Sequence, residues 1–171
     1  MTSPEVHGVC DERFAPVRQV FEANFANGLE AGASVAVTVD GEFVVDLWGG
    51  VADIDTGRPW ERDTIVNVWS STKTMVALVA LELADRGLLD LHAPVATYWP
   101  EFATAGKEGI EVRHVLGHTA GLSGWREPMT IDGLYDLPTA TSLLAAQAPL
   151  WEPGTASGYH AITEGHLMGE I

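Results

Sequence analysis

A serine and a lysine three residues apart, Ser70 and Lys73, form the most chemically suggestive pair in the sequence. Residues three apart on a helix lie on the same face, so the lysine amine can reach the serine hydroxyl. An amine held among apolar groups loses its proton more readily, and it can then accept the hydroxyl proton and make the serine a nucleophile. Backbone N–H groups at the start of the helix would also favour negative charge that develops nearby. The pair therefore predicts acyl transfer through a serine.

The same two residues also have an ordinary structural interpretation. Ser70 could cap a helix, and Lys73 could extend along a surface to reach water. The segment that follows argues against this, because residues 74–84 are apolar on nearly every face and such a helix belongs in the centre of a domain. Its first turn would then lie at the floor of a cleft. We therefore favour the catalytic interpretation; Ser71 is out of frame with Lys73.

Hydrophobic periodicity predicts the elements that must hold this helix in place. A helix is expected over 14–25, and two strands over 33–39 and 42–48 are joined by the Asp40-Gly41 hairpin turn. A loop is expected over 51–60, and a short apolar strand over 64–69 leads into the central helix over 69–87. Later in the chain we expect helices over 112–116, 139–147 and 161–171 and a loop over 123–138.

Length and composition fit one globular domain with a real core. The 171 residues have a formal net charge of −15, a field that repels phosphate groups and anionic lipid, so neither nucleic acid nor a membrane is an expected partner. The single cysteine, Cys10, excludes an internal disulfide, and there is no Cys/His framework for structural zinc. Since the sequence shows no export signal and no apolar run of membrane-spanning length, we expect a cytoplasmic protein.

Three further motifs follow the Ser70–Lys73 pair. They are His118-Thr119-Ala120-Gly121-Leu122, Pro153-Gly154-Thr155 and Gly158-Tyr159-His160-Ala161. In this order and spacing, and with Ser70-Ser71-Thr72-Lys73 before them, they resemble the serine β-lactamase-like superfamily. The resemblance is to its class C-like branch, which contains carboxylesterases, DD-peptidases and related acyltransferases, and it runs from about Ala33 to the end of the chain.

The resemblance implies a fold class and a domain organisation. The fold would be α/β (α+β), a β-lactamase/transpeptidase-like antiparallel sheet flanked by helices, with a helical subdomain. Residues 1–171 would form the N-terminal part of one serine hydrolase domain. Within it, residues 1–69 would supply the N-terminal helix and first strands, and residues 70–171 the central helix and the helical subdomain.

The same resemblance implies roles for three residues. Ser70 would be the acyl-forming nucleophile, Lys73 its proton partner, and Tyr159 the second-motif tyrosine that shares general acid and base work. Physically, a tyrosine beside a lysine cation gives up its proton more readily, so it can take the serine proton and pass it to the leaving group. The alternative for Tyr159 is a buried aromatic ring with a satisfied hydroxyl.

The sequence departs from the family pattern in two ways. The β-lactamases of this branch tend to have asparagine two residues after the tyrosine, whereas Ala161 stands here and resembles the esterase members. The third motif, a strand that supplies an oxyanion N–H, does not occur before Ile171, and the last helix has no capping signal. We therefore expect the chain to be truncated, with a missing C-terminal half or a second chain completing the fold.

Other residues are weaker candidates. Trp125 and Tyr135, in the expected loop, could line an apolar pocket for the substrate acyl group, although loop aromatics also simply close over a core. His114 and His118 are four apart and could present two imidazoles to a metal, but no third ligand accompanies them and structural roles are favoured. No metal and no organic cofactor is implied.

These observations together predict a serine carboxylesterase. The enzyme would form an acyl-enzyme on Ser70 from a small-molecule, short-chain ester and then pass the acyl group to water. One alternative is a β-lactamase or DD-peptidase that acts on β-lactam or peptidoglycan amides. The other is a catalytically silent binding member that keeps the fold.

Overall fold

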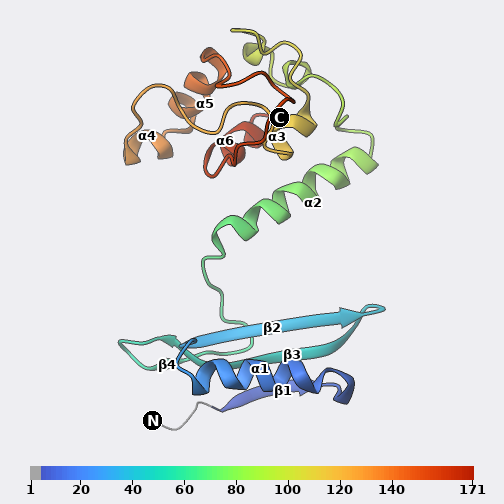
Figure 1. The fold of residues 1–171 in the computed structure, drawn as a ribbon, viewed down its shortest axis with the longest axis vertical. Coiled ribbons are helices and arrows are strands. Elements are labelled where there is room, and N and C mark those ends of the chain that lie inside the picture. The colour runs from blue at the N-terminus through green and yellow to red at the C-terminus, as the bar shows by residue number, and fades with distance from the viewer. Residues whose placement is uncertain (1–4) are drawn as a thin grey trace. The chain divides into compact units, whose positions relative to one another are not determined.

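The computed structural model describes residues 5–171, which divide into two compact units between Asn67 and Val68. Figure 1 shows the elements of each unit. The first unit is an antiparallel sheet with one helix, and the second is helical. No helix of the described residues combines the length and the apolar character needed to cross a membrane.

The first unit contains a sheet in the order β1-β3-β2, on which helix α1 packs. Its main elements are β1 (Val6–Cys10), α1 (Ala15–Ala26), β2 (Gly32–Val39) and β3 (Glu42–Asp53), and β4 (Arg58–Pro59) pairs with the end of β3. Alternate residues of β3 turn toward the helix, so that Val45 and Leu47 are fully buried against Phe21 and Phe25. Burial of this one face holds the helix and the sheet together.

The structure confirms the helix and the hairpin of this unit. Asp40 and Gly41 both have positive φ angles, of 50° and 83°, as a two-residue hairpin turn requires. The strand after the turn is longer than expected, because β3 continues to Asp53 into the segment expected to be a loop. Strand β1 had no prediction at all: it has only five residues, and Gly8 interrupts its side-chain pattern.

The strand expected over 64–69 is wrong. Residues 64–68 have no regular structure, and the 3₁₀ turn η2 (Trp69–Ser71) follows them. β-branched residues suggested a strand, but a strand needs a partner for its backbone groups, and none of the described strands pairs with this segment. The side chain of Ile65, in this segment, is exposed rather than buried.

The second unit surrounds a core of its own with five α-helices. They are α2 (Thr72–Asp85), α3 (Val112–Leu116), α4 (Ile131–Tyr135), α5 (Leu137–Ala146) and α6 (Thr163–Gly169). Helix α6 contacts α2, α3 and α5. The long connection between α2 and α3 also contributes to the core, through the short turns η3 (Val95–Thr97) and η4 (Pro100–Phe102). The fully buried core side chains include Val95, Phe102, Val112, Val115, Leu122, Leu144 and Leu167.

The loop expected over 123–138 is only partly a loop, because α4 and the start of α5 lie within it. Both helices begin at polar caps. The Thr130 side chain accepts a hydrogen bond from Gly133 N–H, and the Asp136 side chain accepts one from Thr139 N–H. These residues, together with Pro138, resemble turn signals in sequence but are also helix-start signals.

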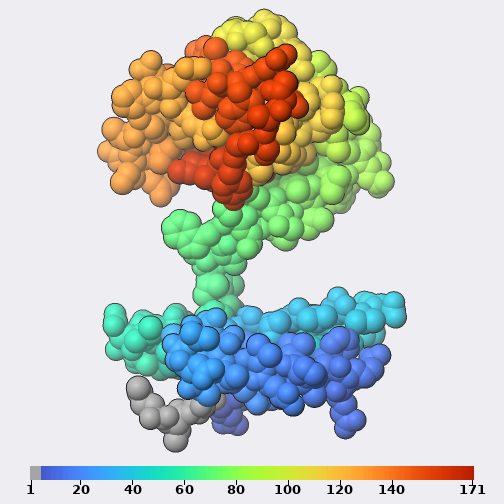
Figure 2. Space-filling view, viewed as in Figure 1, coloured from blue at the N-terminus to red at the C-terminus, as the bar shows by residue number. Residues whose placement is uncertain are grey.

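The expectation that the helix after Ser70 lies buried in the centre of a domain is wrong for the described chain. Of the residues of α2, only Ala80 is buried, and more than half of the side-chain surface of Met75 and Val79 is exposed. The atoms of α2, green in Figure 2, form part of the surface of their unit. Together with α6 and Ile171 the helix lines an apolar groove of about 450 Å³. A helix that is apolar on all sides is expected to be buried on all sides, but the rest of the second unit packs against only one side of α2.

A buried lysine binds three backbone carbonyls around the C-terminal end of α5. Lys107 is fully buried, and its Nζ donates hydrogen bonds to the carbonyls of Thr104, Ala145 and Gln147 at 2.9, 2.7 and 2.6 Å. The last carbonyls of a helix lack donors within the helix, so the ammonium supplies what α5 cannot. Burial lowers the pKa of Lys107. The three carbonyls therefore compensate for the loss of water around this charge.

The buried core of the second unit predicts that shortening a side chain of α5 to alanine lowers the free energy of unfolding only where that side chain is buried. In Leu144→Ala the free energy of unfolding should fall by about 2–5 kcal/mol, because a fully buried leucine leaves a cavity. The control is Leu137→Ala on the same helix, whose side chain is exposed and whose effect should stay below about 1 kcal/mol. Urea denaturation of the full-length protein measures both. Equal losses in the two variants would contradict this account of the core.

Candidate active site

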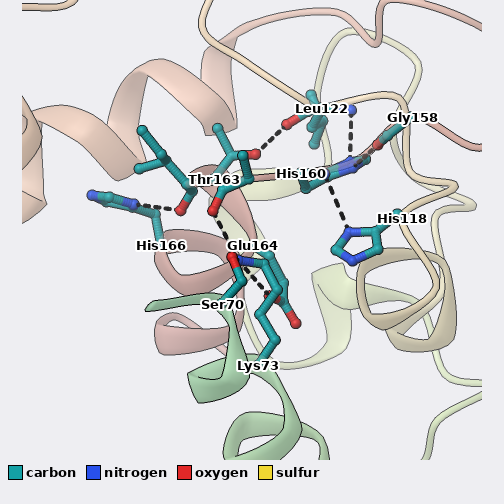
Figure 3. A network of polar contacts seen from close by, with 11 residues as sticks. Ser70, Lys73, His118, Leu122, Gly158, His160, Thr163, Glu164 and His166 are labelled. Atoms are coloured by element: carbon teal, nitrogen blue, oxygen red, sulfur yellow. Dashed lines mark hydrogen bonds and ion pairs between the residues drawn. The ribbon is translucent and has the colours of Figure 1, made fainter. Parts of the chain in front are cut away.

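Ser70 and Lys73 meet at the start of α2, as their spacing predicts. Ser70 lies in the 3₁₀ turn and Lys73 in the first turn of the α-helix. Lys73 Nζ donates a hydrogen bond to Ser70 Oγ at 3.4 Å and a second one to the backbone carbonyl of Ala161 at 2.8 Å (Figure 3). Ser71, not Ser70, occupies the N-cap position of α2, and it makes no capping hydrogen bond. The Ser70 hydroxyl is therefore engaged by the lysine and not by helix capping.

The residue before the serine has an unusual backbone conformation. Trp69 has a φ of 49°, in the left-handed region that is costly for a bulky residue. Such strain persists only where the surrounding structure enforces it, and it concentrates at functional sites. Here it lies directly before Ser70, at the turn that leads into α2.

Tyr159 lies beside the lysine. Lys73 Nζ is 5.1 Å from the centre of the Tyr159 ring, and this ring packs edge-on against His118 at 4.8 Å. The tyrosine is 54% exposed, and within residues 5–171 no hydrogen bond engages its hydroxyl. A buried ring with a satisfied hydroxyl is therefore not what the structure contains. The fold brings Ser70, Lys73 and Tyr159 together, with the tyrosine hydroxyl open to a further partner.

Two histidines hold the Tyr159 segment in place. His160 N–H donates to His118 Nδ1 at 3.2 Å, and His118 has a left-handed φ of 58°. His160 Nε2 accepts from Leu122 N–H at 3.1 Å, so the ring proton is on Nδ1 and is donated to the Gly158 carbonyl at 2.6 Å. Burial lowers the pKa of His160, and the hydrogen bond to Gly158 partly opposes this. A neutral imidazole of one tautomer thus links the motif at 118–122 to the motif at 158–161.

Glu164, which was not predicted from the sequence, also lies in this cluster. Its side chain is only 3% exposed, and its Oε2 lies 3.7 Å from Lys73 Nζ without a hydrogen bond. Burial raises the pKa of Glu164, and the positive charge of Lys73 opposes that rise. The helix start is anchored nearby by Thr163 Oγ1, which donates to the Leu122 carbonyl at 2.6 Å. An acidic residue in a largely apolar stretch was the only sequence signal.

The two predicted substrate-binding aromatics lie elsewhere in the second unit. Trp125 is partly buried against the core, donates from Nε1 to the Ala140 carbonyl at 2.8 Å and packs edge-on against His166. Tyr135 ends α4 and is 83% exposed. In the described part of the chain neither makes a hydrogen bond or ring contact with Ser70, Lys73 or Tyr159. Their role in binding an acyl group stays a prediction.

The histidine pair considered for a metal has other partners. His114 Nδ1 accepts from Glu111 N–H at 3.2 Å and completes a capping box at the start of α3, while His118 bonds to His160 as described. Across residues 5–171, no three His, Cys, Asp or Glu side chains are grouped closely enough to hold a metal ion. Both histidines therefore have structural hydrogen bonds, His114 within the start of α3 and His118 to the segment that carries Tyr159.

Comparisons with known proteins match this chain to one group. The model of the family described as Beta-lactamase matches residues 17–171. The protein described as Esterase/beta-lactamase LipL, from Mycobacterium tuberculosis, is 45% identical over 166 residues, which are 97% of this chain and 38% of that protein. A crystal structure of a family VIII carboxylesterase is 51% identical, with a TM-score of 0.92, and the match covers 97% of this chain and 45% of the other.

A second solved structure, of a penicillin-binding protein homolog from Caulobacter crescentus, is 46% identical with a TM-score of 0.93 and the same coverage. These neighbours confirm the expected fold class, an antiparallel sheet flanked by helices with a helical subdomain. The chain spans less than half the length of the relatives it matches.

The buried neutral state of His160 predicts a specific loss of stability in acid. Its pKa is lowered on folding, so its full contribution is present above the unfolded-state value of about 6.5 and is lost as the pH falls through the folded value. The full-length protein should therefore lose more unfolding free energy between pH 7.5 and 5.5 than His160→Gln does. In His7→Gln, where the histidine is exposed, the unfolding free energy should fall with pH as it does in the wild type. Urea denaturation at each pH measures this fall, and an identical fall in all three proteins would contradict a buried, neutral His160.

Proposed function

The chain belongs to the beta-lactamase family, and we propose that the protein is a serine hydrolase that cleaves short-chain carboxylic esters. The observation that carries the proposal is the contact of Lys73 Nζ with Ser70 Oγ, at the start of a helix and beside Tyr159. Relatives described as an esterase and as a carboxylesterase support the reaction class. Since the chain spans less than half of these relatives, the proposal concerns the full-length protein.

Catalysis would proceed through an acyl-enzyme. Ser70 Oγ attacks the ester carbonyl carbon while its proton passes to the Lys73–Tyr159 pair, and the same pair returns a proton to the departing alcohol. Water then attacks the acyl-Ser70 ester and releases the acid. Backbone N–H groups at the start of α2 would favour the negative charge that develops on the carbonyl oxygen.

Residues outside this chain would complete the site. The family's third motif, which supplies an oxyanion N–H, is not among these 171 residues, and we propose that further polypeptide provides it. The coverage of 38% and 45% of the relatives supports this. Trp125 and Tyr135 remain candidates for the acyl pocket, which that polypeptide would also help to form.

Two alternatives remain of interest for specific reasons. A β-lactamase or DD-peptidase activity is suggested by the descriptions of the relatives as Esterase/beta-lactamase and as a penicillin-binding protein homolog. Against it, Ala161 offers Lys73 only a backbone carbonyl, where the β-lactamase pattern has asparagine. A silent binding protein would have no need for an exposed tyrosine beside an engaged Ser–Lys pair.

The nucleophile can be tested by fluorophosphonate labelling of the full-length protein. Ser70→Ala should abolish labelling, because Ser70 Oγ is the hydroxyl that is hydrogen-bonded to Lys73 Nζ. The matched control is Ser71→Ala, which removes the neighbouring hydroxyl and should leave labelling unchanged. Lys73→Met should slow labelling about 10²–10⁴-fold, the usual range for loss of a proton-transfer group. Labelling that persists in Ser70→Ala would refute the proposed nucleophile.

The substrate class can be tested with two chromogenic compounds. We expect kcat/KM for p-nitrophenyl butyrate to exceed that for nitrocefin by about 100-fold or more, the scale of a loss of one well-placed transition-state contact. Ser70→Ala measures the background for both compounds. Nitrocefin turnover equal to ester turnover would favour the β-lactamase alternative instead.

A further inference from the structure

One buried polar atom in the second unit has no hydrogen bond, and its charged neighbour is the lysine of the site. Within residues 5–171, Glu164 Oε2 is one of two buried side-chain nitrogen or oxygen atoms that lack a hydrogen bond. The residue is almost completely buried, at the first turn of α6, and this oxygen lies 3.7 Å from Lys73 Nζ. A buried carboxyl group without a hydrogen bond is costly, so its retention in a stable fold requires a reason.

The other surroundings of Lys73 show what the carboxyl group adds. An ammonium group has three N–H donors. Two of them serve Ser70 Oγ at 3.4 Å and the Ala161 carbonyl at 2.8 Å. The remaining near neighbours are Glu164 Oε2 and the face of the Tyr159 ring. Oxygen acceptors and an aromatic face are all groups that interact favourably with an ammonium group.

We propose that Glu164 is a positioning residue that keeps Lys73 charged and directs its ammonium group toward Ser70 Oγ. The proposal rests on the proposed function of the Ser70–Lys73–Tyr159 cluster and adds a fourth member to it. An ammonium group cannot accept a proton, so the proton of Ser70 must go to another group. Tyr159 is the remaining oxygen acid of the cluster, and it can take this proton only as the phenolate, which then becomes the neutral phenol and returns the proton to the leaving alcohol.

The pH response of this arrangement depends on every titratable group nearby. These are Lys73 from α2, His118 from the segment after α3, and Tyr159 and His160 from the segment before α6. Burial raises the pKa of Glu164, while Lys73 and His118 lower it. The lysine is the close, charged partner, and the neutral His160 already has a partner at each ring nitrogen.

The test is the pH profile of fluorophosphonate labelling in Glu164→Gln of the full-length protein. Glutamine keeps the shape and one oxygen acceptor but removes the charge. We expect the alkaline limb of the profile to move to lower pH by about one unit or more, as for loss of an opposite charge within 4 Å. Glu164→Asp, which keeps the charge, should restore most of the wild-type profile. A purely structural role would lower stability without moving the limb.

The matched control is Glu170→Gln, the same substitution at an exposed position just after α6, and its profile should equal the wild type. Superimposed profiles of wild type and Glu164→Gln would overturn the proposal. Faster labelling of Glu164→Gln at acidic pH would overturn it too, because Lys73 would then be acting as the base.

A second measurement keeps this proposal separate from the proposed function. If the wild-type protein shows no Ser70-dependent labelling, the esterase proposal fails, and the Glu164–Lys73 pair is then followed by ¹³C NMR of the Glu164 carboxyl carbon. The signal is assigned by its loss in Glu164→Gln. The pKa of Glu164 should rise further in Lys73→Met, because the ammonium group lowers it in the wild type. An unchanged pKa would overturn the pairing.

Discussion

The arrangement of the site depends on one ammonium group. Lys73 Nζ reaches Ser70 Oγ in the 3₁₀ turn before its own helix and the Ala161 carbonyl far along the chain. It also lies near the Tyr159 ring and the Glu164 carboxyl group. Each of these groups is useful only if α2 and the segment before α6 are held at a fixed separation. A long, flexible side chain can join them because the lysine stem spans that gap. Its positive charge also lowers the pKa of the Glu164 carboxyl group, against the effect of burial.

The segment that carries Tyr159 is held by buried polar groups with satisfied hydrogen bonds. His160 has a partner at both ring nitrogens, one of them Leu122 N–H, and the Thr163 hydroxyl donates a hydrogen bond to the carbonyl of the same Leu122. At the other end of the unit, Lys107 binds three carbonyls around the end of α5. A satisfied polar network in a core specifies a single arrangement, because any displacement leaves a group unpaired. Glu164 is the exception within the site, and this exception faces the lysine.

The exposed side of α2 has the opposite character. Its apolar residues would bury well, yet in the described structure they line an open groove together with α6 and Ile171. A hydrophobic sequence states that a helix has a favourable free energy of burial, but it does not state which surface covers it. The site residues at the start of α2 have a different requirement, because they must stay accessible to solvent and substrate. Ala80, the buried residue of α2, anchors the helix that carries them to the core.

The elements that depend on local interactions were predicted from the sequence. The Asp40-Gly41 turn, the helix α1 and the short helix α3 depend on residues close together in the chain, and so does the Ser70–Lys73 contact. The resemblance placed Tyr159 beside that pair. Only the tertiary structure decided the rest. Strand β1 exists because β3 supplies its hydrogen-bond partner, and the apolar segment before Trp69 is not a strand because none of the described strands pairs with it. Glu164 and the Ala161 carbonyl reach Lys73 only because the chain folds back, and a contact of that range leaves no periodic trace in sequence.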